Sequence, residues 1–421
     1  MTAFHQIARR EEIRKNLSAI AHSLTNPENY FIVDHPSLAV GKSGIALFLA
    51  YYSQFTRSKK AQQCSQRYLR DALDRLEQLD DTSIASGFFG VSWTFSNLYH
   101  AGFISRGDLA AVRDINDLVE LSIEQHYHSR NYDLLYGMIG IGMCVLENPT
   151  FPRRSFVLKA IGEKLASISL ETDEGRTWQN YFSVERSSPE DIAFDLGLAH
   201  GVPSVIAFLC QLYDIGIARR TLRPLILDTT RWLLNQECEF VDRLGNHYSF
   251  QNKHVNKRSA NWSRVAWCYG DLGVAACLLH VYNSTGDKIY YAKAYDCVAR
   301  TITRNHEASG LFYNLEHRSV DGGFCHGAAG IALMYHLFAR TFKDNRFCAS
   351  RDYYLRFLFD NIDTRLPLAG HLKYKNDPVD KCIYMTGDAG LLEGVAGVGL
   401  CFLSMLEDRT LGWERLFFLQ Y

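Results

Sequence analysis

The stretch "GGFCHGAAGIALMY" (residues 322–335) decides the fold, because its pattern returns along the whole chain. A pair of glycines leads into two adjacent reactive residues, Cys325 and His326, and a Gly-x-x-Gly turn then opens a run of apolar and small residues. Neighbouring side chains on a helix point about 100° apart. The two residues can therefore serve one site only from a loop or a helix entrance, where the flanking glycines free the backbone.

Six further segments share this glycine-centred turn and the apolar run that follows it. The glycines that open the seven runs are Gly41, Gly87, Gly137, Gly201, Gly270, Gly327 and Gly394. They are separated by 46, 50, 64, 69, 57 and 67 residues, which is enough for two helices and their loops. Amphipathic stretches lie between them, for example residues 61–79, 219–236 and 287–302. The repeat is therefore predicted to be an amphipathic outer helix alternating with an apolar inner helix.

The repeat predicts an all-α fold, because seven apolar helices must bury one another. A closed α/α toroid does this, with seven inner helices forming a barrel and seven outer helices wrapped around it, in a single domain over residues 1–421. An open solenoid is the competing arrangement, but its inner helices usually keep a solvated face, which these lack. Two polar, aromatic stretches, residues 174–188 and 239–255, are expected to form hairpins or a small β-containing insertion.

Composition and charge narrow the class of protein. The net charge is −1 with 22% charged residues, so no overall basic field indicates nucleic acid binding. The N-terminus is charged and has no apolar core of a secretion signal, and no apolar run is long enough to span a bilayer. Eleven cysteines, an odd number without a close CxxC pair, favour reduced thiols. A cytoplasmic protein is expected.

The reactive residues fall at the starts of the predicted inner helices, which would place them on one rim of the barrel. They are Asp133 four residues before Gly137, His200 directly before Gly201, Cys268 two residues before Gly270, and Cys325 and His326 directly before Gly327. Two thiols and an imidazole are ligands that Zn²⁺ prefers, and three protein ligands leave a fourth position open, as in catalytic sites. Each residue taken alone has a plainer interpretation, as a core cysteine, a core histidine or a helix cap.

Four motifs together resemble the lanthionine synthetase C-like (LanC) cyclases. They are "LAHG" (198–201), "WCYGDLG" (267–273), "FCHGAAG" (324–330) and "LGWERLFFL" (411–419), set within the seven repeats. The resemblance implies an α/α toroid with a zinc ion at the top of the barrel. It implies the zinc ligands Cys268, Cys325 and His326, and the catalytic residues His200, Asp133, Arg264 and Tyr269.

The resemblance also implies a reaction, the addition of cysteine thiols to dehydroalanine or dehydrobutyrine in a dehydrated precursor peptide with its leader. Zinc would hold the thiol, whose pKa is otherwise near 8.5, as a thiolate. His200 would protonate the resulting enolate, Asp133 would orient that histidine, and Arg264 or Tyr269 would stabilise the enolate charge. A dehydratase and an ABC exporter are the implied partners, with peripheral membrane association through such a complex.

Three other functions stay open at the level of sequence. A LanC-like zinc protein using glutathione or another small thiol would have the same site. A helical-ring carbohydrate enzyme or terpenoid cyclase would need paired carboxylates, for which Asp388 and Glu393 are the only rivals to Asp133. A non-catalytic scaffold that binds peptide would need no turnover at all.

Overall fold

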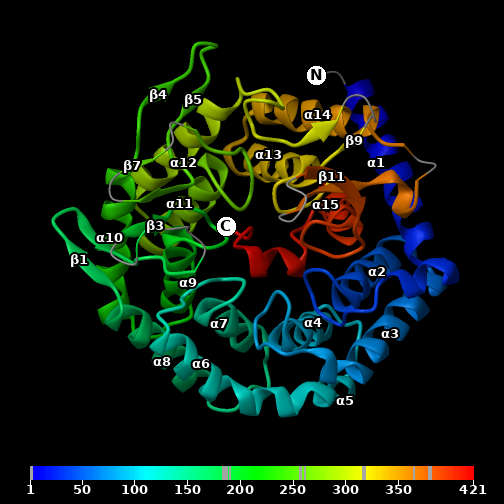
Figure 1. The fold of residues 1–421 in the computed structure, drawn as a ribbon, viewed down its shortest axis with the longest axis horizontal. Coiled ribbons are helices and arrows are strands. Elements are labelled where there is room, and N and C mark those ends of the chain that lie inside the picture. The colour runs from blue at the N-terminus through cyan, green and yellow to red at the C-terminus, as the bar shows by residue number, and fades with distance from the viewer. Residues whose placement is uncertain are drawn as a thin grey trace. The chain divides into compact units, whose positions relative to one another are not determined.

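The computed structural model describes residues 3–182, 188, 191–255, 258–259, 262–314, 319–363, 366–377 and 382–421. These residues contain fifteen α-helices and eleven short strands (Figure 1). The chain divides into two compact units, one of residues 1–81, 85–111 and 311–412, the other of residues 82–84, 112–310 and 413–421. That the whole chain acts as a single domain stays a prediction.

The first unit holds four apolar inner helices and the helices that cover them. The inner helices are α2 (Lys42–Thr56), α4 (Phe88–His100), α13 (Ala328–Phe342) and α15 (Val395–Leu406). The outer ones are α1 (Ala3–Leu24), α3 (Lys59–Asp74), α5 (Arg106–Leu109) and α14 (Asn345–Asp360). Helix α3 packs on α2, α14 on α13 and α1 on α15, while α15 lies between α2 and α13 (Figure 1). Short 3₁₀ helices are η1 (Pro27–Ile32), η2 (Leu76–Gln78) and η4 (Leu368–Gly370).

The second unit repeats the same construction with three inner helices. These are α7 (Met138–Glu147), α9 (Val202–Asp214) and α11 (Asp271–Thr285). Their outer partners are α6 (Val119–His128), α8 (Arg154–Ser167), α10 (Arg219–Asn235) and α12 (Lys288–Thr301). The 3₁₀ helix η3 (Ala110–Leu118) leads into α6, and η5 (Gly412–Phe417) comes near the C-terminus. The chain end is anchored in this unit, because the indole of Trp267 donates to the Phe417 carbonyl at 2.9 Å.

The β structure is confined to small antiparallel sheets in the loops. In the second unit they are β1 (Leu170–Thr172) with β2 (Gly175–Thr177), β4 (Phe240–Val241) with β5 (His247–Tyr248), and β3 (Ala193–Asp195) with β6 (Lys253–Val255) and β7 (Arg258–Ser259). The first two hairpins and β6 fall largely on the stretches predicted from sequence, although residues 183–187 lie outside the described part. The first unit adds two hairpins that the sequence pattern did not predict, β8 (Tyr313–Asn314) with β9 (Ser319–Val320) and β10 (Leu372–Asp377) with β11 (Cys382–Gly387).

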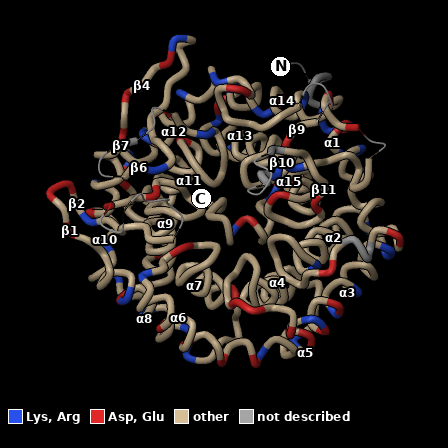
Figure 2. Tube along the Cα trace, viewed as in Figure 1, with Lys and Arg blue, Asp and Glu red and all other residues tan. Residues whose placement is uncertain are grey.

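The inner helices are apolar because most of their residues are buried. Every residue of α15 is buried, and charged residues concentrate on the outer helices and loops (Figure 2). The three buried charged residues on inner helices are each paired: Lys42 with Asp71, Glu147 with Arg415, and Asp271 with Arg304. Pairing is required there, because an isolated buried charge is very costly. Among the described residues, every helix is too short or too polar to cross a lipid bilayer.

The Gly-x-x-Gly pattern, which opens six of the seven inner helices, has a steric cause. All seven glycines that open the repeats are N-cap residues of inner helices. A Cβ on Gly327 would lie 2.3 Å from the backbone nitrogen of Gly323, and one on Gly330 would lie 1.7 Å from the carbonyl oxygen of Phe324. The glycines therefore let the preceding loop fold tightly over the first turn of the helix, where the reactive residues lie.

Candidate metal and catalytic site

A turn closed by an aspartate side chain precedes the inner helices α9, α13 and α15. In each, an aspartate six residues before the N-cap glycine accepts a hydrogen bond from the backbone N–H two residues further on. The pairs are Asp195 with Gly197 (2.8 Å), Asp321 with Gly323 (3.0 Å) and Asp388 with Gly390 (2.7 Å). This is an Asx turn, in which one carboxylate oxygen fixes the loop and the second can serve another group. The repeat thus sets a carboxylate beside each of these helix entrances.

In the first unit, the loop before α13 carries Cys325 and His326. The backbone N–H of Cys325 donates to the carbonyl of Leu392 at 2.8 Å, which ties this loop to the one before α15. The Cys325 side chain is buried, with 7% of the residue exposed, and the His326 side chain is 12% exposed. The His326 ring lies 5.4 Å from the ring of Tyr374 on β10. Cys325 and His326 thus lie in the loop before α13, where two adjacent side chains can serve one site.

In the second unit, the loop before α11 carries Cys268, of which only 4% is exposed. Its carbonyl accepts a hydrogen bond from the backbone N–H of Ala199 at 3.3 Å. Gly197 allows this close approach, since a Cβ there would lie 2.5 Å from the Cys268 carbonyl oxygen and 2.5 Å from the ring of Tyr269. The loops before α9 and α11 are therefore held against each other by backbone contact.

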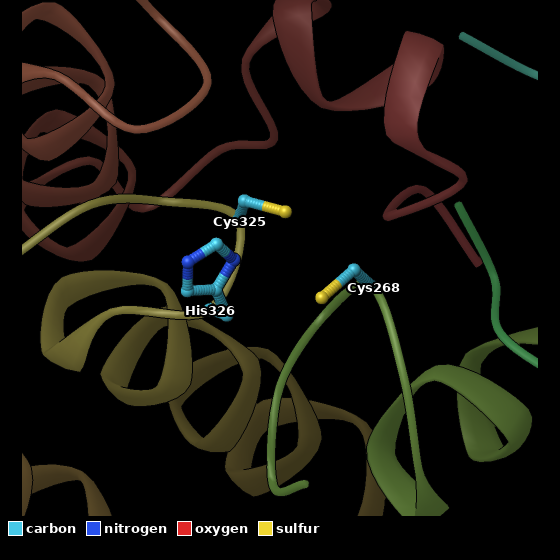
Figure 3. A group of neighbouring side chains, drawn as sticks. All are labelled: Cys268, Cys325 and His326. Carbon is cyan, nitrogen blue, oxygen red and sulfur yellow. The ribbon is translucent and has the colours of Figure 1, made fainter. Parts of the chain in front are cut away.

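The proposed metal ligands form a group whose chemistry and spacing fit zinc. The ligand atoms of Cys268, Cys325 and His326 all lie within 4.8 Å of one another (Figure 3). Around a tetrahedral zinc, with Zn–S of about 2.3 Å and Zn–N of about 2.0 Å, such atoms are about 3.5–3.8 Å apart. Two thiols and one imidazole are also the donors that zinc favours over the hard cations. The residues present are thus suited to hold this ion and leave one coordination position for another ligand.

His200 and Asp133 form a hydrogen-bonded pair in the second unit. The Nδ1 atom of His200 lies 2.7 Å from Oδ2 of Asp133, which is fully buried. The other oxygen of Asp133 accepts from the backbone N–H groups of Leu135 (2.6 Å) and Tyr136 (2.9 Å), so the carboxylate is fixed. Burial lowers the pKa of His200, but the charge and hydrogen bond of Asp133 outweigh it. With further charge from Asp195 and Cys268, they raise the pKa to about 9.

Tyr269 contacts a residue that sequence reasoning missed. Its hydroxyl donates to Oδ2 of the fully buried Asp195 at 2.9 Å, and its ring lies 6.2 Å from that of His200. Burial, and then the negative charge of Asp195, raise the pKa of Tyr269, so the phenol stays protonated. Asp195 could have been found from the repeat, because it occupies the same position before its glycine as Asp321 and Asp388.

Arg264 occupies this six-before-glycine position in the fifth repeat. Its backbone N–H donates to Oδ1 of Asn252 at 3.3 Å. A Cβ on Gly270 would lie only 1.9 Å from the carbonyl oxygen of Arg264, so this position leaves no room for a side chain. The positive φ of 85° at Gly270 is a conformation that favours glycine. The structure thus places the backbone of Arg264 at the turn that carries Cys268 and Tyr269.

The carboxylates that would support a carbohydrate enzyme are engaged otherwise. Asp388 and Glu393 both bind the ammonium group of Lys373, at 2.7 and 2.8 Å. Both carboxylates are thus occupied by one cation, whereas a glycosidase needs its acid and base to face the glycosidic bond from two sides. This pair is therefore a poor candidate for acid–base chemistry on a glycoside.

A cavity of about 670 Å³ lies in the second unit. Its walls come from the β1–β2 turn, β3, β6 and the end of α10. The residues lining it are Thr172, Asp173, Glu174, Ile192, Phe194, Leu196, Trp232, Asn235, Gln236, Cys238, Gln251 and His254. None of the predicted site residues is among them.

Comparison with known proteins agrees with this arrangement. Residues 32–418 match the family described as "Lanthionine synthetase C-like protein". The nisin biosynthesis protein NisC of Lactococcus lactis subsp. lactis is 22% identical over 370 residues, covering 80% of this chain and 83% of that protein. The solved structure of a nisin cyclase superposes with a TM-score of 0.70 at 17% identity, covering 98% of this chain and 97% of that one. The predicted all-α toroid fold and the family resemblance are confirmed, and the chain belongs to the lanthionine synthetase C-like family.

Proposed function

We propose that this protein is a zinc-dependent lanthionine synthetase, which closes thioether rings in a dehydrated precursor peptide. A cysteine thiol of the peptide adds to the β-carbon of a dehydroalanine or dehydrobutyrine residue. The observation that carries the proposal is the Cys268, Cys325 and His326 group, in a chain whose family and fold match a nisin cyclase and which also holds the His200–Asp133 pair.

The metal is assigned to the three ligands that fit it. Cys268, Cys325 and His326 would hold the zinc, and the bound ion supplies a way to keep the peptide thiol deprotonated at neutral pH. The low exposure of both cysteines limits water at the ligands and protects the thiols from oxidation.

The proton needed after the addition is assigned to His200. When the C–S bond forms at the β-carbon, the electrons of the C=C bond move toward the neighbouring carbonyl, and the α-carbon must then take up a proton. Because the pKa of His200 is raised to about 9, its imidazolium form is present at neutral pH. Asp133 holds Nδ1–H and leaves Nε2–H as the group that donates. The thiol loses one proton and the α-carbon gains one, so the mass of the peptide is unchanged.

Stabilisation of the developing enolate is assigned to Arg264. Sequence reasoning left Arg264 and Tyr269 as alternatives, and the hydroxyl proton of Tyr269 is directed at Asp195. Tyr269 therefore presents a hydroxyl oxygen rather than a free donor to its surroundings. Its role is assigned to holding the loop beside His200, and the guanidinium of Arg264 supplies the cation that the reaction requires.

The proposal is tested by combining the zinc-loaded protein with a chemically dehydrated cysteine-containing peptide. Ring closure removes free thiol without any change in mass, which thiol alkylation followed by mass spectrometry detects. In parallel, glutathione is added to a dehydrated peptide that lacks cysteine. A gain of one glutathione per dehydro residue in that arm, without ring closure in the first, would favour a small-thiol transferase instead. Absence of both reactions with zinc bound would favour a peptide-binding scaffold.

The partners form a separate part of the proposal. The substrate is a precursor peptide that has already been dehydrated, so a dehydratase must act before this protein. Assembly with that dehydratase and with an ABC exporter, which would bring the protein to a membrane, is tested by co-purification of the three expressed together. If the dehydratase and the exporter dissociated from this protein at mild salt concentration, the peptide substrate would remain as the supported partner.

A further inference from the structure

Asp321 is a buried aspartate whose second carboxylate oxygen has no hydrogen-bond partner among the described residues. The residue is 1% exposed. Its Oδ1 atom closes the Asx turn with the N–H of Gly323 at 3.0 Å. Its Oδ2 atom is buried and receives no hydrogen bond from the described residues, yet lies 3.4 Å from Nε2 of His326. A buried acceptor without a donor is costly, by roughly 1–3 kcal/mol, so a donor is expected at this position.

The imidazole of His326 can supply that donor in only one tautomer. With the proton on Nε2, the ring donates toward Asp321 and Nδ1 carries the lone pair that binds a metal. With the proton on Nδ1, two acceptors would face each other and the atom left to bind metal would be the one that faces the aspartate. Histidines that bind metals commonly donate their other N–H to a carboxylate, which fixes the ring and raises its basicity.

Glu393 is the rival partner, and its geometry is weaker. Its Oε1 atom is 3.9 Å from Nε2 of His326, and its side chain is 32% exposed. Its Oε2 atom is already engaged by the ammonium of Lys373 at 2.8 Å. Asp321 is nearer and buried, and its Oδ2 accepts no hydrogen bond from the described residues, so it is the better acceptor for Nε2–H of His326.

The other capped turns show the same use of the second oxygen. In the fourth repeat Asp195 receives the hydroxyl of Tyr269, and in the seventh Asp388 receives the ammonium of Lys373. In both cases the same carboxylate also fixes its own turn through the backbone N–H two residues on. Asp321 is the third member of this series, and His326 is the group next to it.

We propose that Asp321 is the positioning residue of the metal site, which accepts Nε2–H of His326 and so presents Nδ1 to the zinc. The inference rests on the zinc site of the proposed function. It assigns Asp321 two tasks, closing the turn with one oxygen and fixing the tautomer of a ligand with the other.

The first test measures zinc affinity by competition with a chromophoric chelator, using the full-length zinc-loaded protein. Asp321→Asn keeps the oxygen that closes the turn but replaces the second acceptor with an amide NH₂, which faces Nε2 as a donor. We expect zinc binding to weaken by about 10–100-fold, with the thermal unfolding profile of the zinc-free protein retained. Equal affinity in a folded Asp321→Asn protein would overturn the assignment.

Two control variants separate this effect from loss of charge or a rival contact. Asp81→Asn removes a carboxylate at the same position of the second repeat, where Asp81 accepts from Ser86 at 2.6 Å, and should leave zinc affinity unchanged. Glu393→Gln should change it by less than Asp321→Asn does. A larger loss in Glu393→Gln would assign the role to that residue.

The second test observes the tautomer directly and needs no variant. Nitrogen NMR of zinc-loaded protein labelled in its histidines should show His326, identified by its absence from His326→Gln, with a protonated Nε2 and a metal-bound Nδ1. A metal-bound Nε2 would overturn the inference even if Asp321→Asn failed to fold. If the wild-type protein bound no zinc, the proposed function would fail first, which is a distinct result.

Discussion

Two histidines occupy the same place in two repeats and are held in different ways. His326 and His200 each stand directly before the N-cap glycine of an inner helix, in "CHG" and "AHG". His326 faces an aspartate of its own turn, five residues earlier, at 3.4 Å. His200 instead pairs with an aspartate 67 residues earlier, Asp133 of the preceding repeat, at 2.7 Å. The position alone therefore does not set the chemistry of the ring.

The difference lies in which ring nitrogen is engaged and in what precedes the histidine. Asp133 takes Nδ1 of His200 and raises its pKa to about 9, which favours a charged ring that can give up a proton. Asp321 lies near Nε2 of His326. The residue before His326 is a cysteine, Cys325, whereas the residue before His200 is Ala199. A ring that donates Nε2–H and presents Nδ1 beside a thiol suits a metal ligand. In our proposal, one repeat position therefore supplies a proton donor in one unit and a metal ligand in the other.

The largest effect is expected from removing the cysteine that distinguishes the two turns. Cys325→Ala changes "FCHG" to "FAHG", which resembles the turn of His200. With two of three ligands left, zinc content should fall from about one per chain to near zero, and ring closure should disappear with it. Metal analysis of dialysed protein and the thiol-loss assay measure the two. A Cys325→Ala variant that kept both zinc and normal turnover would show that Cys325 is not what distinguishes the turn of His326 from that of His200.

The next largest effect is expected at the other histidine, with the metal retained. His200→Asn should slow ring closure by about 10²–10⁴-fold, since a general acid contributes this much, while zinc content stays near that of the wild type. The contrast with Cys325→Ala separates the two tasks. Parallel loss of zinc in His200→Asn would mean that the histidine serves the ligand set and not the proton transfer.

A smaller effect is expected on the pH dependence when Asp133 is changed. Because the pKa of His200 is raised to about 9 from 6.5, the pair stabilises the fold fully below pH 6.5, and this contribution is lost as the pH rises through 9. Asp133→Asn should lower the pKa of His200 by about one unit or more and move the loss of activity to lower pH. Histidine NMR of the zinc-free protein measures the pKa, and rate–pH profiles measure the second effect. An unchanged profile would show that another group limits the reaction.

The repeat made most of the fold, and the grouping of the three proposed ligands, predictable from sequence. At the start of α13, Gly327 and Gly330 are needed because the preceding loop folds over the first turn of the helix and leaves no room for a Cβ. This backbone contact explains why the glycines recur in the sequence. Cys268, Cys325 and His326 could be placed together because all three lie one or two residues before such a glycine. Residues whose roles depend on the turn before the glycine were harder to see.

Asp195 and Asp321 show where sequence reasoning stopped. Both lie six residues before their glycines, but aspartate in a turn is ordinary, and its second oxygen has no pattern in sequence. Only the fold shows that this oxygen meets Tyr269 in one repeat and approaches His326 in another. The hairpin β8–β9 was missed for a related reason, since its two-residue strands show no alternation. The strands of β10–β11 have six residues each, and the alternation Leu-Lys-Tyr-Lys at 372–375 is a strand signal that was overlooked.

The smallest effect on turnover is expected from Tyr269→Phe, which tests whether the second oxygen of these aspartates matters outside the metal ligands. Removing the hydroxyl leaves Oδ2 of the buried Asp195 without this donor, which should lower the free energy of unfolding by about 1–3 kcal/mol. Ring closure should slow by only about tenfold or less, because Tyr269 supports the loop and does not transfer the proton. Chemical denaturation and initial rates measure the two. Adding Asp195→Asn should cost little more, since the two partners act through one bond. A drop in rate as large as that of His200→Asn would instead place the tyrosine hydroxyl in the chemical step.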